Sequence, residues 1–134
     1  MAISASVIFC DDIRVEGNGK LILIGLYPAD LVPGFLPQMM TLSIWVRLRG
    51  LAPGAHNARF TLGVNGVTQT EAEVALVAPE SKEANLSIIG LPIELKDYGR
   101  ITFSLAGFPG GETVHEELPI VPAAVSATVA GANR

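Results

Sequence analysis

Glycine and proline recur along this chain at intervals that leave no room for long helices. Fourteen glycines and nine prolines account for 23 of the 134 residues, and they separate short runs rich in β-branched residues. No window of helix length keeps an apolar stripe at helical spacing without meeting one of them. The runs recur about every 8 to 12 residues, a spacing typical of sandwiches and barrels. The sequence therefore predicts an all-β chain.

Size and composition indicate one domain. The chain has a mass of 14.1 kDa, and 49% of its residues are apolar while 16% are charged, which excludes intrinsic disorder. We predict a single domain over residues 1–121, an antiparallel β-sandwich of about seven to nine strands with immunoglobulin-like or C2-like architecture, and a small β-barrel as the alternative. Residues 122–134 are rich in alanine, and we expect a disordered C-terminal tail.

Charge and composition exclude several classes of partner. The net charge of −4 lacks the basic excess that a nucleic acid demands. No apolar run reaches the roughly 18 residues of a membrane span, and the N-terminus lacks the basic residues of a secretory signal. One cysteine and two histidines provide neither a disulfide framework nor a structural zinc site. We expect a cytoplasmic protein without a cofactor, a nucleic-acid partner or a membrane span.

The N-terminal region predicts a hairpin. Strands are expected over residues 3–10, 13–16 and 20–27. Asn18-Gly19 suits a two-residue type I′ turn, which would place Val15 opposite Ile22. Residues 21–26 are apolar on both faces, which predicts a central strand whose outer face is covered by a loop, a helix or a second subunit.

A second hairpin is expected over residues 57–77, and its loop length follows from its charges. A two-residue Asn65-Gly66 loop would place the acids of the second strand on the same face as Phe60 and Leu62. A three-residue loop over residues 64–66 keeps those acids outside and sets Arg59 opposite Glu71. We therefore predict the three-residue loop.

The remaining segments complete the sandwich. Residues 28–37 contain three prolines and predict a long irregular connection. Strands are expected over residues 84–95, where Gly90 and Pro92 indicate a bulge or a sheet edge, over residues 100–105, and over residues 112–121.

The strand expected over residues 41–49 carries the most informative surface residues. Its even-numbered positions are apolar, so Trp45, Arg47 and Arg49 point away from the core. A tryptophan flanked by arginines is favoured at protein interfaces, and it can also stack on a sugar ring or a base. The alternative is local: the connection over residues 28–37 covers Trp45, and the arginines pack over it or pair with acids of the second hairpin, Glu71 and Glu73.

Three aspartates are candidate metal ligands. Asp11 and Asp12 form the densest acidic cluster, and Asp97 lies in a later turn. Carboxylate oxygens suit Ca²⁺, but consecutive residues of an extended chain point to opposite faces, and the motif of a dedicated calcium loop is missing. We expect one aspartate of the pair to bond turn backbone, and the other to be solvated or paired with Arg14.

No motif indicates catalysis. A nucleophile elbow is missing, and His115 lacks the second histidine of a metalloprotease helix. Cys10 lies in an apolar strand, where it is expected to behave as a small buried hydrophobe. His56 follows a Pro-Gly turn, as an ordinary surface histidine does. We predict no catalytic residue and no enzyme.

The opening stretch VIFCDDIRVEGNGKLILIGLYP combines a CDD-x-R-x-E segment with a GKLxLIGxY segment. This signature, together with the later stretch KDYGRITFSLAG, resembles an uncharacterised bacterial family of a domain of unknown function. The resemblance implies a small all-β protein and supplies no activity.

The functional hypothesis is therefore drawn from the surface. The excess of apolar residues and the low charge predict large apolar patches on a small monomer. We predict a non-enzymatic structural or protein-interaction module that forms a homo-oligomer or binds a protein partner. The alternative is a carbohydrate- or lipid-binding sandwich, assisted by calcium.

Overall fold

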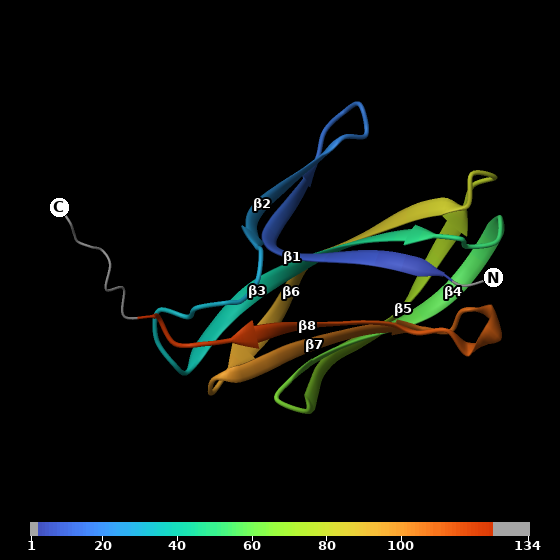
Figure 1. Cartoon of the computed structure of the whole chain (residues 1–134). Helices are drawn as coiled ribbons and strands as arrows, with labels where there is room; N and C mark the ends of the chain where they lie inside the picture. Colours follow the sequence, from blue (N-terminus) through green and yellow to red (C-terminus); the bar gives the residue numbers. More distant parts are fainter. Residues whose placement is uncertain (1–2, 125–134) are drawn as a thin grey trace.

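The computed structural model describes residues 3–124 and shows two four-stranded antiparallel sheets (Figure 1). Sheet A has the strand order β2-β1-β3-β6, and sheet B has the order β5-β4-β7-β8. The sheets are not closed into a barrel, so the predicted β-sandwich is confirmed and the barrel alternative is wrong. The eight strands lie within the predicted number.

A glycine or a proline lies in every connection between strands except residues 96–98, and several others lie inside strands, such as Gly63 and Gly90. In chain order the strands are β1 (Ser4–Val15), β2 (Leu21–Tyr27), β3 (Gln38–Arg49), β4 (Gly54–Val64), β5 (Val67–Ala78), β6 (Glu83–Leu95), β7 (Gly99–Ala106) and β8 (Val114–Ile120). A single 3₁₀ turn, Pro109–Gly111, connects β7 to β8. Among the residues that the structure describes, none form a helix long and apolar enough to cross a membrane.

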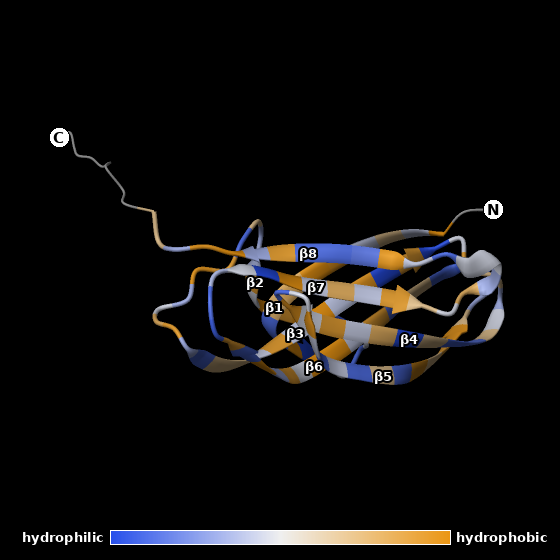
Figure 2. Cartoon of the chain, turned by 90° about the horizontal axis from the view of Figure 1, so that it is seen from below, coloured by the Kyte–Doolittle hydropathy of each residue, from blue (hydrophilic) through white to orange (hydrophobic). Residues whose placement is uncertain are grey.

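The core is built from alternate residues of both sheets, which meet between the layers. The alternation predicted for β3 is confirmed, because its inward residues are fully buried: Leu42, Ile44, Val46 and Leu48. On sheet B, Phe103 of β7 stacks on Phe60 of β4 with 6.4 Å between the ring centroids. Figure 2 shows the resulting mixture of apolar and polar positions along the strands of sheet B.

The first hairpin differs from the prediction. Residues 4–15 form one continuous strand rather than two, and Val15 lies opposite Leu21 rather than Ile22. Its loop has three residues: the Glu16 N–H donates to the Lys20 carbonyl at 2.8 Å, and Gly19 has a φ of +85°. A three-residue loop needs only this one left-handed residue, and glycine adopts that conformation at little cost.

The second hairpin also differs, in the opposite sense. Its loop has two residues, because Val64 pairs with Val67 while Asn65 and Gly66 have φ values of +50° and +83°. The predicted three-residue loop is therefore wrong, and Arg59 pairs in register with Glu73. The acids still stay outside the core, because the register shifts at a bulge two residues from the turn.

β2 is an edge strand, so the prediction of a central strand is wrong. In Figure 1 the hairpin formed by β2 and the second half of β1 projects from the body of the sandwich. We call residues 11–24 of this hairpin the arm. A strand that is apolar on both faces is typical of a sheet centre, but here the strand order leaves one side of β2 open.

The predictions for residues 28–37 and for β6 are confirmed. Residues 28–37 form an irregular connection in which Leu31 is buried and makes an isolated bridge to Ile120. β6 is both bulged and at an edge: its register with β3 shifts opposite Ser43, beside Gly90. The Ser43 hydroxyl, which is fully buried, accepts a hydrogen bond from the Gly90 N–H at 3.0 Å. The expected disordered tail lies, from residue 125 on, outside the described residues.

Candidate interaction surface

Trp45, Arg47 and Arg49 lie together on the outer face of sheet A. They belong to β3, which is flanked by β1 and β6. Trp45 is half-buried and stands directly opposite Ile8 of β1 and Ser87 of β6. Cross-strand neighbours of this kind pack against each other, so the sheet surface itself covers part of the indole ring.

The two arginines do not pair with the acids that the local alternative named. Arg47 donates a hydrogen bond to Glu83 of β6 over 2.7 Å, and this bond, with the positive charge of Arg47, holds the pKa of Glu83 below its usual range. Arg49 lies opposite Glu83 in the ladder. Glu71 and Glu73 are on sheet B, where both contact Arg59.

The connection over residues 28–37 extends along β8. The Leu31 N–H donates to the Pro119 carbonyl at 2.8 Å, and the Leu31 carbonyl accepts from the Val121 N–H at 3.0 Å.

The Trp45 indole nitrogen is buried and has no hydrogen-bond partner within residues 3–124. An unpaired buried donor is unusual, and it distinguishes Trp45 from its neighbours on this face.

The largest group of exposed apolar side chains continues from this face along β2. Ile22, Ile24 and Leu26 are 43%, 39% and 47% exposed, and they pair with Arg14, Asp12 and Cys10 of β1. Paired residues lie on the same side of a sheet, and Cys10 in turn pairs with Ser43 of β3. Because Ser43 and Trp45 are two residues apart on one strand, all three β2 side chains lie on the Trp45 side of sheet A.

The candidate metal ligands each bond to a protein group. Asp11 accepts a hydrogen bond from the Tyr27 hydroxyl, Asp12 accepts one from the Ile13 N–H at 2.9 Å, and Asp97 accepts one from the Tyr98 N–H at 2.7 Å. Asp12 also lies 3.8 Å from Arg14. The predicted division of these two contacts between Asp11 and Asp12 is wrong, because Asp12 makes both, within a strand rather than a turn, and Asp11 bonds Tyr27 instead. Asp97 is in the turn between β6 and β7. Residues 3–124 contain no group of three histidine, cysteine or acidic side chains that could hold a metal ion.

Burial governs the titration of two groups beside the arm. Tyr27 has a pKa raised above its usual range, first by burial and then by its hydrogen bond to Asp11. Cys10 is fully buried, as predicted, and its pKa is raised by burial and by the neighbouring charges of Asp11 and Asp12. The thiolate is the reactive form, so Cys10 is a poor nucleophile.

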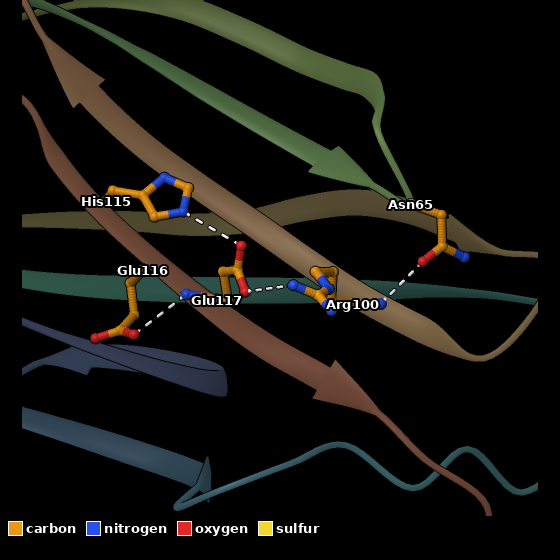
Figure 3. A network of polar contacts seen from close by, with 5 residues as sticks. All are labelled: Asn65, Arg100, His115, Glu116 and Glu117. Carbon is orange, nitrogen blue, oxygen red and sulfur yellow. Dashed lines mark hydrogen bonds and ion pairs between the residues drawn. The ribbon is translucent and has the colours of Figure 1, made fainter.

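The outer face of sheet B has a different character. In Figure 3, Arg100 of β7 and Glu117 of β8 form an ion pair, and His115 also approaches Glu117. The nitrogen–oxygen distances are 3.0 and 3.4 Å. With the contacts of Arg59 on β4, these pairs make this face polar, which is typical of a surface in contact with water.

Two side-chain amides, which the sequence analysis missed, connect distant segments. Gln69, the extra residue at the bulge of β5, donates to the Glu94 carbonyl and accepts from the Glu94 N–H, both at 2.8 Å. Gln69 thereby links the edges of the two sheets, beside a cleft of about 500 Å³ that also involves Met39 and Pro92. The Asn65 side-chain amide likewise donates to one backbone group, the Tyr98 carbonyl, and accepts from another, the Arg100 N–H. A turn-forming Asn-Gly pair was the only sequence signal near these residues.

No family model matches this chain, and none of the curated proteins compared with it is similar to it.

Proposed function

We propose that this protein is a non-enzymatic structural or protein-interaction module, and that it self-associates through the outer side of sheet A. The observation that carries the proposal is the contrast between the two outer faces. Sheet A presents Trp45 and the adjoining exposed side chains of Ile22, Ile24 and Leu26, beside the Arg47–Glu83 pair. Sheet B presents mainly ion pairs, and its exposed valines, Val67 and Val77, lie at the two ends of β5. Exposed apolar patches of this kind mark interaction surfaces in soluble proteins.

The free energy of burying apolar side chains also favours association through the outer side of sheet A. Burial of apolar surface contributes about 25 cal/mol per Å², so covering four large apolar side chains adds several kcal/mol in favour of a complex. The arginines beside Trp45 supply the polar rim that surrounds the apolar centre of an interface. Arg47 is already oriented by Glu83, which lowers the entropy lost when a partner binds.

The positions of the reactive side chains support a role without catalysis. Cys10 is buried in sheet A, His115 is exposed on the outer face of sheet B, and His56, near the start of β4, contacts the Ala52 carbonyl at 2.6 Å. A nucleophile and its base must lie within hydrogen-bond distance, but these three residues lie on different strands, and the two histidines contact other groups.

The test is the absolute mass in solution, measured by light scattering behind a sizing column across a dilution series. We expect a dimer or larger assembly that dissociates on dilution, and Trp45→Ala should shift dissociation to higher protein concentration. Val77→Ala is the matched control, because Val77 is an exposed apolar residue of sheet B. A wild-type monomer at every concentration would contradict self-association, and an unchanged mass for Trp45→Ala would exclude this face from the interface.

A further inference from the structure

We infer that the open edge of β2 pairs in antiparallel fashion with the same edge of a second copy, so that two A sheets join into one continuous sheet. The inference rests on the proposed self-association and adds to it the element, the partner and the register. Its physical basis is the row of backbone N–H and C=O groups that an edge strand presents to whatever lies beside it.

The four edge strands of the sandwich differ in how they are protected. β5 carries Glu71 and Glu73, β6 carries a bulge and Pro92, and β8 carries two glutamates and Pro119 and is bridged by Leu31. Charges, prolines and bulges are the usual means by which edges avoid pairing with other chains. The β2 segment LILIGLY contains no charge and no proline, and it keeps one register with β1, with Gly25 at a φ of +67° as its one left-handed residue.

The backbone groups of β2 that face outward can be assigned from its pairing with β1. The Glu16 N–H donates to the Lys20 carbonyl, and hydrogen-bonded pairs alternate along an antiparallel ladder. Ile22, Ile24 and Leu26 therefore direct their N–H and C=O groups toward β1. The backbone N–H and C=O groups of Leu21 and Leu23 point to the open edge, where they could form hydrogen bonds with a second strand.

The register follows from the length of the strand and from its exposed side chains. β2 has seven residues with Ile24 at the centre, so an antiparallel pair that uses the whole strand is symmetric about Ile24. It sets Ile24 against Ile24 of the second copy and Ile22 against Leu26 of the second copy. All three exposed apolar side chains are then covered by equivalents from the other molecule, as a two-fold interface requires.

The charges around β2 fit a second copy of the same chain. Pairing introduces no like-charge contact within the strand, and the antiparallel direction places the two Lys20 side chains at opposite ends. Each Lys20 then lies where the second copy continues through Pro28 toward Asp30, an opposite charge. The two Asp12 residues are three strand spacings apart, roughly 14 Å, which exceeds the screening length at physiological salt. The same pairing of β5 with β5 would bring glutamates together.

The experiment uses cysteine cross-linking in a Cys10→Ala background. In the proposed register the two Ile24 residues form a non-hydrogen-bonded pair, whose Cα separation of about 4.5 Å is compatible with a disulfide. Ile24→Cys should therefore give a covalent dimer under mild oxidation at dilutions where non-specific contacts are rare. Val77→Cys, an exposed position on the β5 edge, is the matched control and should stay monomeric.

A charge substitution tests the same contact without oxidation. Ile24→Lys sets two positive charges against each other and should abolish the assembly, while Val77→Lys should leave its mass unchanged. Circular dichroism of Ile24→Lys should match the wild type, because the side chain is already partly exposed. If Ile24→Lys unfolds, its mass is not interpreted, and the Ile24→Cys cross-linking result tests the edge contact by itself.

The outcomes separate this inference from the proposed function. An assembly that keeps its mass in Ile24→Lys, or that does not cross-link through Ile24→Cys, would overturn edge pairing and leave self-association through the Trp45 face. A wild-type protein that is monomeric at every concentration would overturn both. Efficient cross-linking with a monomeric Ile24→Lys variant would establish the edge contact, whatever the result for Trp45→Ala.

Discussion

At the scale of single residues, Asn65 shows how one side chain joins two turns that are distant in sequence. Its amide donates to the Tyr98 carbonyl at 3.1 Å and accepts from the Arg100 N–H at 2.9 Å. The fit is close: a Cβ at Gly99 would lie 1.8 Å from the Asn65 amide oxygen, so the facing turn requires glycine. Asparagine also tolerates the left-handed backbone of this position better than most residues.

Replacing Asn65 should separate these two contributions. Asn65→Gly keeps the left-handed backbone and removes both side-chain hydrogen bonds, so we expect a loss of about 1 to 3 kcal/mol in the free energy of unfolding. Asn65→Ala should cost more, because it adds backbone strain. Urea unfolding measures both. Asn18→Ala is the control, since within residues 3–124 the Asn18 side chain bonds only to the Lys20 N–H of its own turn. Equal effects at the two positions would contradict a linking role for Asn65.

Tyr27 predicts a dependence of stability on alkaline pH. Its pKa is raised in the folded protein by burial and by Asp11, whereas the unfolded residue ionises near pH 10. A raised pKa means that the folded state holds the proton longer, so the stabilisation is complete below about pH 9 and decreases as the pH rises through about 10 and 11. Urea unfolding across this range should show a decline that is smaller in Tyr27→Phe. Equal declines would show that Tyr27 does not carry the effect.

At the scale of the elements, the two hairpins show which predictions a local pattern supports. The inward and outward faces of β3, β4 and β7 could be predicted, because alternation depends only on neighbouring residues. The requirement that Glu71 and Glu73 stay outside the core was also correct. The loop lengths could not be predicted, because a hairpin can satisfy this requirement through its turn or through a bulge. The chain uses a two-residue turn with a bulge, and the bulge directs Gln69 toward β6.

Gln69 should therefore contribute to the attachment of the two sheets. Gln69→Glu keeps an acceptor for the Glu94 N–H, loses the donor to the Glu94 carbonyl and adds a negative charge, so we expect it to lower the free energy of unfolding by about 1 to 3 kcal/mol. Gln69→Ala should behave similarly. Thr68→Ala, an exposed neighbour on β5, is the control. Hydrogen exchange at the Glu94 N–H should increase in both Gln69 variants; protection equal to the wild type would contradict the contact.

At the scale of the whole molecule, the sandwich itself was predictable but the strand order was not. Composition and the spacing of glycine and proline restrict the chain to strands around one core, although five of the eight strands, with 11 to 13 residues, are longer than this spacing suggests. The order of strands depends on contacts between distant segments, and no local pattern reveals them. The apolar composition of β2 illustrates this point, because a strand inside a sheet and an unprotected strand at its edge have the same sequence pattern. For the same reason, the surface around Trp45 could be predicted while its connection to the arm could not.

The strand order also has a consequence for synthesis of the chain. β1, β2 and β3 lie within residues 4–49 and can pair as soon as they leave the ribosome, but β6 joins β3 only after the β4–β5 hairpin of sheet B has been made. Translation at about 5 to 20 residues per second leaves the free side of β3 waiting for a few seconds. In that interval the nascent chain presents two open edges, β2 and β3, and the arrival of β6 closes the second of them.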